Sequence, residues 1–173
     1  MDFASMWSVF YDQMFTYNGY KKVLDGLLAT AEIAVFGLLI GIVIGTVLAI
    51  AKVVPKYHLF PRICSGIASV YIALFRGTPM VVQLLIGYFV LMPVLGISAQ
   101  PLSVAILIFG LNSGAYVSEI MRSGINSVDR GQLEAGRAVG LSYSASMFKI
   151  VIPQAIKNIL PTLGNEFIVL VKE

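Results

Sequence analysis

The sequence contains little of what metalloproteins and most enzymes depend on. Its 173 residues include one cysteine, Cys64, and one histidine, His58. A single cysteine excludes an intrachain disulfide, and no cluster of histidine, cysteine and aspartate is available for a metal or for nucleophilic catalysis. We therefore expect Cys64 to be a small apolar filler and His58 a solvated loop residue. The chain is predicted not to be an enzyme.

Charged side chains are also scarce. They make up 12% of the chain, whereas 58% of its residues are hydrophobic. Soluble domains contain about 25% charged and about 45–50% apolar residues. A protein this small cannot bury so much apolar surface, so lipid must form part of its surroundings. The net charge of +3 does not indicate a nucleic-acid partner, because the basic residues lie in short segments between apolar runs.

The apolar runs predict a polytopic all-α membrane protein, since a membrane helix needs about 20 apolar residues. We predict membrane helices at 26–51, 79–95, 101–121 and 159–173, the last of them incomplete. Pro79 and Pro101 suit the first turns of two of these helices. The run 63–75 is shorter and predicts an interfacial or re-entrant helix. Residues 1–25 carry aromatic side chains at helical spacing and predict a segment lying along the membrane interface.

Small residues form one face of the first predicted membrane helix. Gly37, Gly41, Gly45 and Ala49 recur every four residues. Such a ridge lets two helix backbones approach closely in a membrane, where the hydrophobic effect does not drive helices together.

Basic residues orient the predicted helices. The loop 52–78 and the stretch 122–157 hold most of the lysine and arginine, and cytoplasmic loops are enriched in these residues. We therefore predict that both segments are cytoplasmic and that the N-terminus lies outside, in a multi-pass membrane protein.

The stretch 122–157 contains two short amphipathic segments. Residues 132–139 predict a helix that ends where Gly140 adopts a left-handed conformation. Ser142 can cap the helix that follows, and Pro153 is expected to interrupt it. Two short helices hinged at a glycine form a knob that suits a groove on a soluble partner.

The same stretch resembles a motif of the permease subunits of binding-protein-dependent ABC importers: E-A-A, three residues, G, nine residues, then I-x-L-P. Glu134, Ala135, Gly140, Ile150 and Pro153 match it in spacing. Two positions depart from the pattern, with Gly136 in place of the second alanine and Ile152 in place of the leucine. The resemblance implies that the coupling residues are Glu134, Ala135, Gly136, Gly140, Ile150 and Pro153.

Further matches are similar to the polar amino acid (histidine/glutamine-type) permeases. They are the sequences FRGTP at 75–79, SGAYV at 113–117 and NEFI at 165–168. Members of this family continue beyond the position of Lys172 and Glu173. We therefore expect this chain to be truncated in or near its fourth membrane helix.

The resemblance implies an ATP-driven importer of polar amino acids in a prokaryotic cytoplasmic (inner) membrane. No G-x-x-x-x-G-K-[ST] phosphate loop occurs here. ATP and Mg are therefore expected on two separate cytoplasmic ATPase subunits, and no cofactor on this chain. A second permease subunit, identical or a paralogue, and an extracytoplasmic amino-acid-binding protein complete the implied complex. A secondary transporter or channel subunit, or a non-functional permease fragment, remains an alternative.

Polar residues inside predicted membrane helices mark a possible substrate pathway, because such groups usually face a cavity or a partner. The candidates are Asn112, Tyr116, Glu119, Asn165, Glu166 and Lys172. Hydrogen bonding between helices is an equally open alternative, and Glu119 can instead pair with Arg122 one turn away. Arg76 is predicted to be a membrane-edge anchor.

Overall fold

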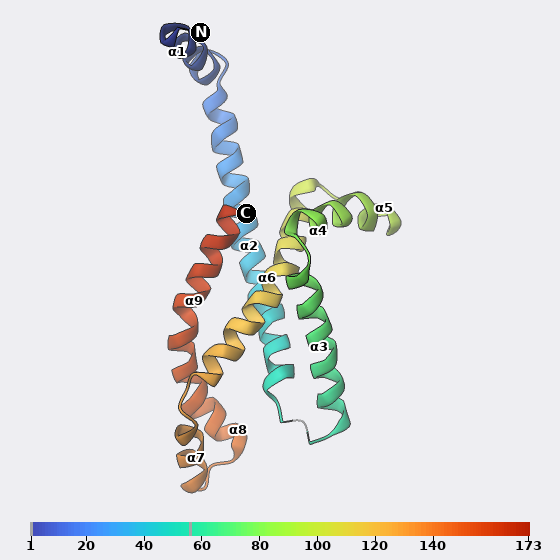
Figure 1. Cartoon of the computed structure of the whole chain (residues 1–173), viewed down its shortest axis with the longest axis vertical. Helices are drawn as coiled ribbons and strands as arrows, with labels where there is room; N and C mark the ends of the chain where they lie inside the picture. Colours follow the sequence, from blue (N-terminus) through green and yellow to red (C-terminus); the bar gives the residue numbers. More distant parts are fainter. Residues whose placement is uncertain (1, 56) are drawn as a thin grey trace.

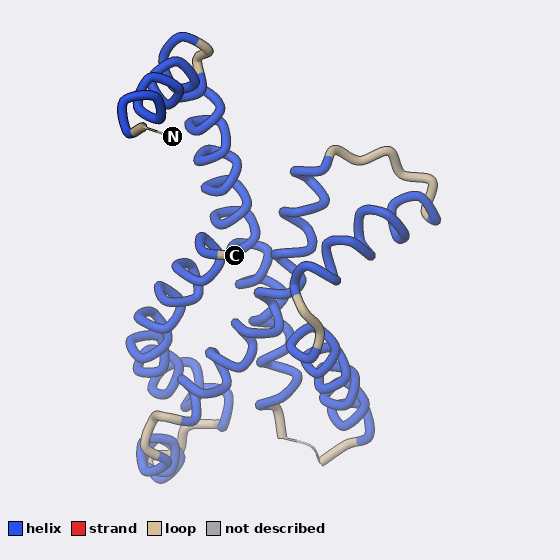
Figure 2. The backbone as a smooth tube through the Cα atoms, turned by 45° about the horizontal axis from the view of Figure 1, so that its top comes forward, coloured by secondary structure: helices blue, strands red, loops and turns tan. Residues whose placement is uncertain are grey.

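The computed structural model describes residues 2–55 and 57–173, and within them the ordered elements are helices joined by short loops (Figures 1 and 2). Met1 and Lys56, which belong to the predicted N-terminal segment and basic loop, lie outside the described residues. The long helices are α2 (Gly19–Val53), α3 (Leu59–Gly77), α6 (Pro101–Asn126) and α9 (Ile152–Lys172). The predicted all-α architecture is confirmed.

Shorter helical elements connect the long ones. Before α2 lie α1 (Phe3–Tyr11) and a π-helical turn, η1 (Asp12–Thr16). Between α3 and α6 lie α4 (Met80–Ile86), the π-helical η2 (Gly87–Leu91) and α5 (Met92–Val94). Between α6 and α9 lie α7 (Arg130–Ala138), α8 (Tyr143–Ser146) and the π-helical η3 (Met147–Val151). The α2–α3 connection and the α7–α8 hairpin lie at the same end of the molecule, opposite the N-terminus (Figure 1).

The predicted ridge of small residues is the centre of the fold. Gly37, Gly41, Gly45 and Ala49 are buried in α2, and the three glycines face α6. Gly110 and Gly114 of α6 lie in turn against Ile40 and Ile44 of α2. The two helices therefore interlock through reciprocal glycines, as close packing in a membrane requires.

The opposite face of α2 carries large apolar side chains that the described residues leave mostly exposed. Val43 and Val47 are 66% and 64% exposed. Exposed apolar surface of this extent is stable in lipid and not in water. Among the described residues, α2, α3 and α6 are long and apolar enough to cross a membrane.

Two predicted segment assignments are corrected. The predicted interfacial run 63–75 lies inside the 19-residue helix α3, which is of membrane-spanning length. Pro61 does not break this helix, because it lies in the first turn, where the missing N–H has no intrahelical partner. The predicted membrane helix 79–95 is instead a shorter helical segment, Met80–Val94, that contains η2.

Other boundaries also differ. Helix α2 begins at Gly19 rather than 26, directly after Asn18, whose φ of +55° ends the preceding helical segment. Helix α6 continues five residues beyond 121, to Asn126, and α9 begins at Ile152 rather than 159. Pro153 does not interrupt the helical backbone as predicted. It lies in the first turn of α9, directly after the π-helical η3. The segment between α6 and α9 is therefore shorter than the predicted cytoplasmic stretch 122–157.

The glycine contacts predict a difference between two equivalent substitutions. A Cβ added at Gly45 would lie 2.7 Å from Cβ of Val117 and 2.9 Å from the backbone nitrogen of Ser118, whereas one added at Gly66 of α3 meets nothing within 4 Å. We expect Gly45→Ala to destabilise the protein by about 1–3 kcal/mol, because α2 must move away from α6. Gly66→Ala is expected to stabilise it by up to about 1 kcal/mol through helix propensity. The melting temperature of each variant in detergent measures these effects. Equal shifts of the melting temperature in Gly45→Ala and Gly66→Ala would contradict the packing of α2 against α6.

Candidate functional site

The predicted coupling segment forms a hairpin of two short helices. Oδ1 of Asp129 accepts a hydrogen bond from the backbone N–H of Gly131 at 2.6 Å and caps α7. At the other end, the N–H of Gly140 donates to the carbonyl of Arg137 (3.0 Å), and the N–H of Leu141 donates to that of Gly136 (3.1 Å). This pair of bonds is the Schellman motif, which requires a left-handed residue. Gly140 supplies it with a φ of +88°, as predicted.

The second helix begins as the sequence indicates. Oγ of Ser142 accepts from the N–H of Ala145 at 3.2 Å and caps α8. The residues from α8 through η3 to α9 keep helical backbone angles, so the hairpin is continuous with a long helix.

Sequence reasoning did not foresee why Gly136 stands where the E-A-A motif has its second alanine. Gly136 is buried, and a Cβ there would lie 2.7 Å from Cδ1 of Ile150 and 2.8 Å from Oγ of Ser146. The glycine thus lets α7 lie directly on α8 and η3, and it brings the two halves of the motif into contact. Glycine has low helix propensity, but here its absent side chain is what permits the packing.

The hairpin presents a surface that the rest of the described chain does not cover. Glu134, Ala135, Gly140 and Pro153 are exposed, and Ile150 is half-buried. Two large apolar side chains stand beside them, Val139 at 78% and Phe148 at 70% exposure. Exposed apolar groups among polar ones are typical of a protein–protein interface.

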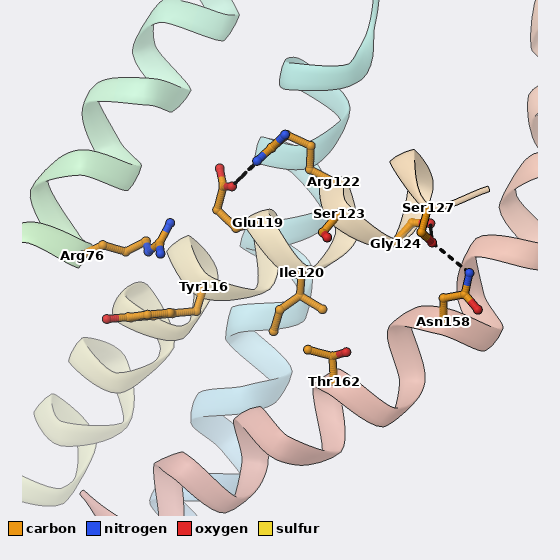
Figure 3. A pocket seen from close by; sticks show the side chains of 10 residues that line it. All are labelled: Arg76, Tyr116, Glu119, Ile120, Arg122, Ser123, Gly124, Ser127, Asn158 and Thr162. Carbon is orange, nitrogen blue, oxygen red and sulfur yellow. Dashed lines mark hydrogen bonds and ion pairs between the residues drawn. The ribbon is translucent and has the colours of Figure 1, made fainter. Parts of the chain in front are cut away.

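Two of the six predicted pathway residues line a cavity of about 570 Å³ (Figure 3). Tyr116 and Glu119 reach into it from α6, beside Arg122. Arg122 donates to Oε2 of Glu119 from Nη2 (2.6 Å) and from Nε (3.2 Å), so the alternative pairing considered from the sequence is present. Arg76 enters from the end of α3 and lies over the ring of Tyr116, 5.2 Å from its centroid.

Asn112 belongs to a different cluster, at the break between α3 and α4. Its Nδ2 donates to the carbonyl of Phe75 (3.2 Å) and to Oε1 of Gln83 (3.1 Å). Nε2 of Gln83 donates to the same carbonyl (2.8 Å) and to Oγ1 of Thr78 (2.8 Å). Two side-chain amides therefore satisfy the carbonyl left unpaired where α3 ends. Sequence reasoning assigned Gln83 no role, and the only signal for one was its position as an amide four residues after Pro79.

The last three predicted pathway residues lie on α9 and do not meet at one site. Glu166 is buried, and its Oε1 accepts from Oγ of Ser113 in α6 at 3.1 Å. Asn165 and Lys172 are exposed. Asn112 and Glu166 thus serve as hydrogen-bonding partners between helices, while Tyr116 and Glu119 face open space.

Comparison with known proteins assigns this architecture. The family model described as the inner membrane component of binding-protein-dependent transport systems matches residues 37–173. The chain is 42% identical over 163 residues to GlnP of Rickettsia prowazekii, named as a glutamine transport system permease, covering 92% of this chain and 72% of that protein. It is 44% identical over 151 residues to ArtQ of Bacillus subtilis, named as an arginine transport system permease. This match covers 87% of this chain and 67% of that protein.

Solved structures show the same fold. The crystal structure of an amino acid ABC transporter with histidines superposes with a TM-score of 0.80 at 38% identity, over 99% of this chain and 73% of that one. An inward-facing structure of the MetNI methionine ABC transporter gives a TM-score of 0.64 at 21% identity, which supports the fold alone.

The amide cluster predicts a stability effect at the α3–α4 break. We expect Gln83→Ala to destabilise the protein by about 1–3 kcal/mol, because the Phe75 carbonyl and Thr78 lose a donor away from water. Gln100→Ala is the matched control, since Gln100 is exposed and its side chain does not cap α6. Thermal unfolding in detergent compares the two, and a loss as large in the control would rule out a specific contribution from the cluster.

Proposed function

This chain belongs to the family of inner membrane components of binding-protein-dependent transport systems, and from this premise we propose that it is the permease subunit of an ATP-driven importer of polar amino acids. Relatives named for glutamine and arginine transport support the substrate class. The observation that carries the proposal is the α7–α8 hairpin, because it places the coupling motif on an exposed knob at the end of a membrane helix bundle.

The hairpin is the proposed docking site for a soluble ATPase. Glu134 offers an exposed carboxylate, and Val139 and Phe148 offer apolar surface. Gly136 and Gly140 shape the hairpin rather than contact the partner: one permits close helix packing, the other the turn. ATP and Mg are bound by that partner, and this chain holds no cofactor of its own.

The complex that fits this subunit contains two permease chains, two ATPases and an extracytoplasmic binding protein. The large apolar side chains exposed on α2 and α3 contact lipid or the second permease, and nucleic acid has no place in the assembly. With the hairpin and the α2–α3 connection in the cytoplasm, Lys52, Arg62, Arg130 and Arg137 obey the positive-inside rule. The N-terminus then lies outside a prokaryotic inner membrane.

Reconstitution tests the proposed function. The complete transporter in liposomes is expected to accumulate a polar amino acid only when ATP is supplied to the ATPase side, and vanadate should abolish this uptake. Radiolabelled L-glutamine and L-arginine are the first substrates to use. Uptake that proceeds equally without ATP would instead indicate a secondary transporter or channel.

A substitution at Gly140 tests the docking surface. Gly140→Trp should insert into the membrane normally but lose copurification with the ATPase, because a side chain at a φ of +88° distorts the turn between α7 and α8. Gly96→Trp is the matched control, since Gly96 also has a positive φ (+67°) with open space around it but lies in the loop before α6. It should copurify as the unmodified chain does. Retention of the ATPase by both variants would contradict the proposed interface.

A further inference from the structure

The cavity between α3, α6 and α9 contains an uncompensated positive charge. Its charged lining consists of Arg76, Glu119 and Arg122 (Figure 3). Both nitrogens of Arg122 that reach Glu119 bond to a single oxygen, Oε2. One carboxylate and two guanidinium groups leave a net charge of +1 in the lining.

Arg76 has its hydrogen-bonding edge free. Across residues 2–55 and 57–173 its contact is the face of Tyr116, and it makes no hydrogen bond or ion pair with another side chain. A cation held over an aromatic ring is attracted by the ring electrons and uses no hydrogen-bond acceptor, so the N–H groups of this guanidinium remain available. These groups form a planar fork that matches a carboxylate.

The position of Arg76 makes this free edge significant. Arg76 ends an apolar helix of membrane-spanning length, and Tyr116 lies near the middle of α6. A charge inside a membrane is costly unless it faces water, a partner or a ligand. Arg76 is exposed at the end of α3, as the predicted membrane-edge anchor would be, and its guanidinium also lies over Tyr116 and lines the cavity.

We propose that Arg76 binds the α-carboxylate of the amino acid in transit, while Oε1 of Glu119 accepts from its α-ammonium group. This inference rests on the proposed function and assigns a task to the cavity. Oε1 accepts no hydrogen bond within the described chain, so it is available. The pair recognises the zwitterionic head that all α-amino acids share, and the substrate side chain is left to other residues.

Binding to the permease–ATPase complex in nanodiscs, without binding protein, tests the assignment. The probes are L-glutamine and L-arginine, each compared with its α-carboxamide, which lacks the carboxylate charge. The acids should bind the unmodified complex about tenfold or more tightly than the amides. Arg76→Gln should weaken binding of the acids by about ten- to hundredfold, to the affinity of the amides. It should change the affinity for the amides by less than about twofold.

Two further variants separate recognition from structure. Arg76→Lys keeps the charge without the fork, so it should retain a reduced preference for acids over amides. Lys22→Gln removes an exposed positive charge far from the cavity and should leave binding unchanged. The assignment is overturned if Arg76→Gln weakens acids and amides equally, or neither. Should that variant fail to assemble, loss of the preference in an assembled Arg76→Lys complex overturns it.

Uptake distinguishes this inference from the function on which it rests. If the complete transporter accumulates no amino acid with ATP, the proposed function fails and the assignment of Arg76 fails with it. If uptake is ATP-driven but the preference for acids over amides does not depend on Arg76, only the assignment of Arg76 is wrong.

Discussion

Close contact between the backbones of α2 and α6 is the constraint on which the rest of this structure depends. In lipid, apolar side chains gain nothing by leaving their surroundings, so helices associate through dispersion contacts and hydrogen bonds. Gly41 and Gly45 provide these contacts by removing the side chains that would hold α6 away. Because α6 also packs against α3 and α9, its distance from α2 sets the position of every element around the cavity.

The sequence predicted features that follow from local chemistry. The four-residue spacing from Gly37 to Ala49 predicted the ridge, and Gly140 and Ser142 predicted the turn and cap of the hairpin, because a left-handed residue and an N-cap act within one turn of helix. The membrane segments between 52 and 100 were predicted less well. Hydropathy does not show that Pro61 lies in the first turn of α3. It also does not show that the next apolar segment, Met80–Val94, contains the π-helical η2.

The substrate pathway shows a second limit of sequence reasoning. Asn112, Tyr116 and Glu119 share a face of α6, yet the first bonds to the end of α3 while the other two line the cavity. What separates them is Gln83, which comes from another helix and pairs with Asn112. The contact of Arg76 with the ring of Tyr116 was not foreseen for the same reason, because it joins residues 40 positions apart in the chain.

The repeat along the α2–α6 contact has a consequence for alignment. A surface that presents a small residue every four positions offers nearly equivalent packing after a slide of four residues, about 6 Å. The ridge therefore sets how near the two helices lie but not which turn faces which. Polar bonds through α3 supply that information: Lys52 Nζ of α2 donates to Oγ of Ser69 (2.8 Å), and the hydroxyl of Tyr71 donates to the carbonyl of Leu111 in α6 (2.7 Å). Helix α3 thus fixes the register of α2 relative to α6.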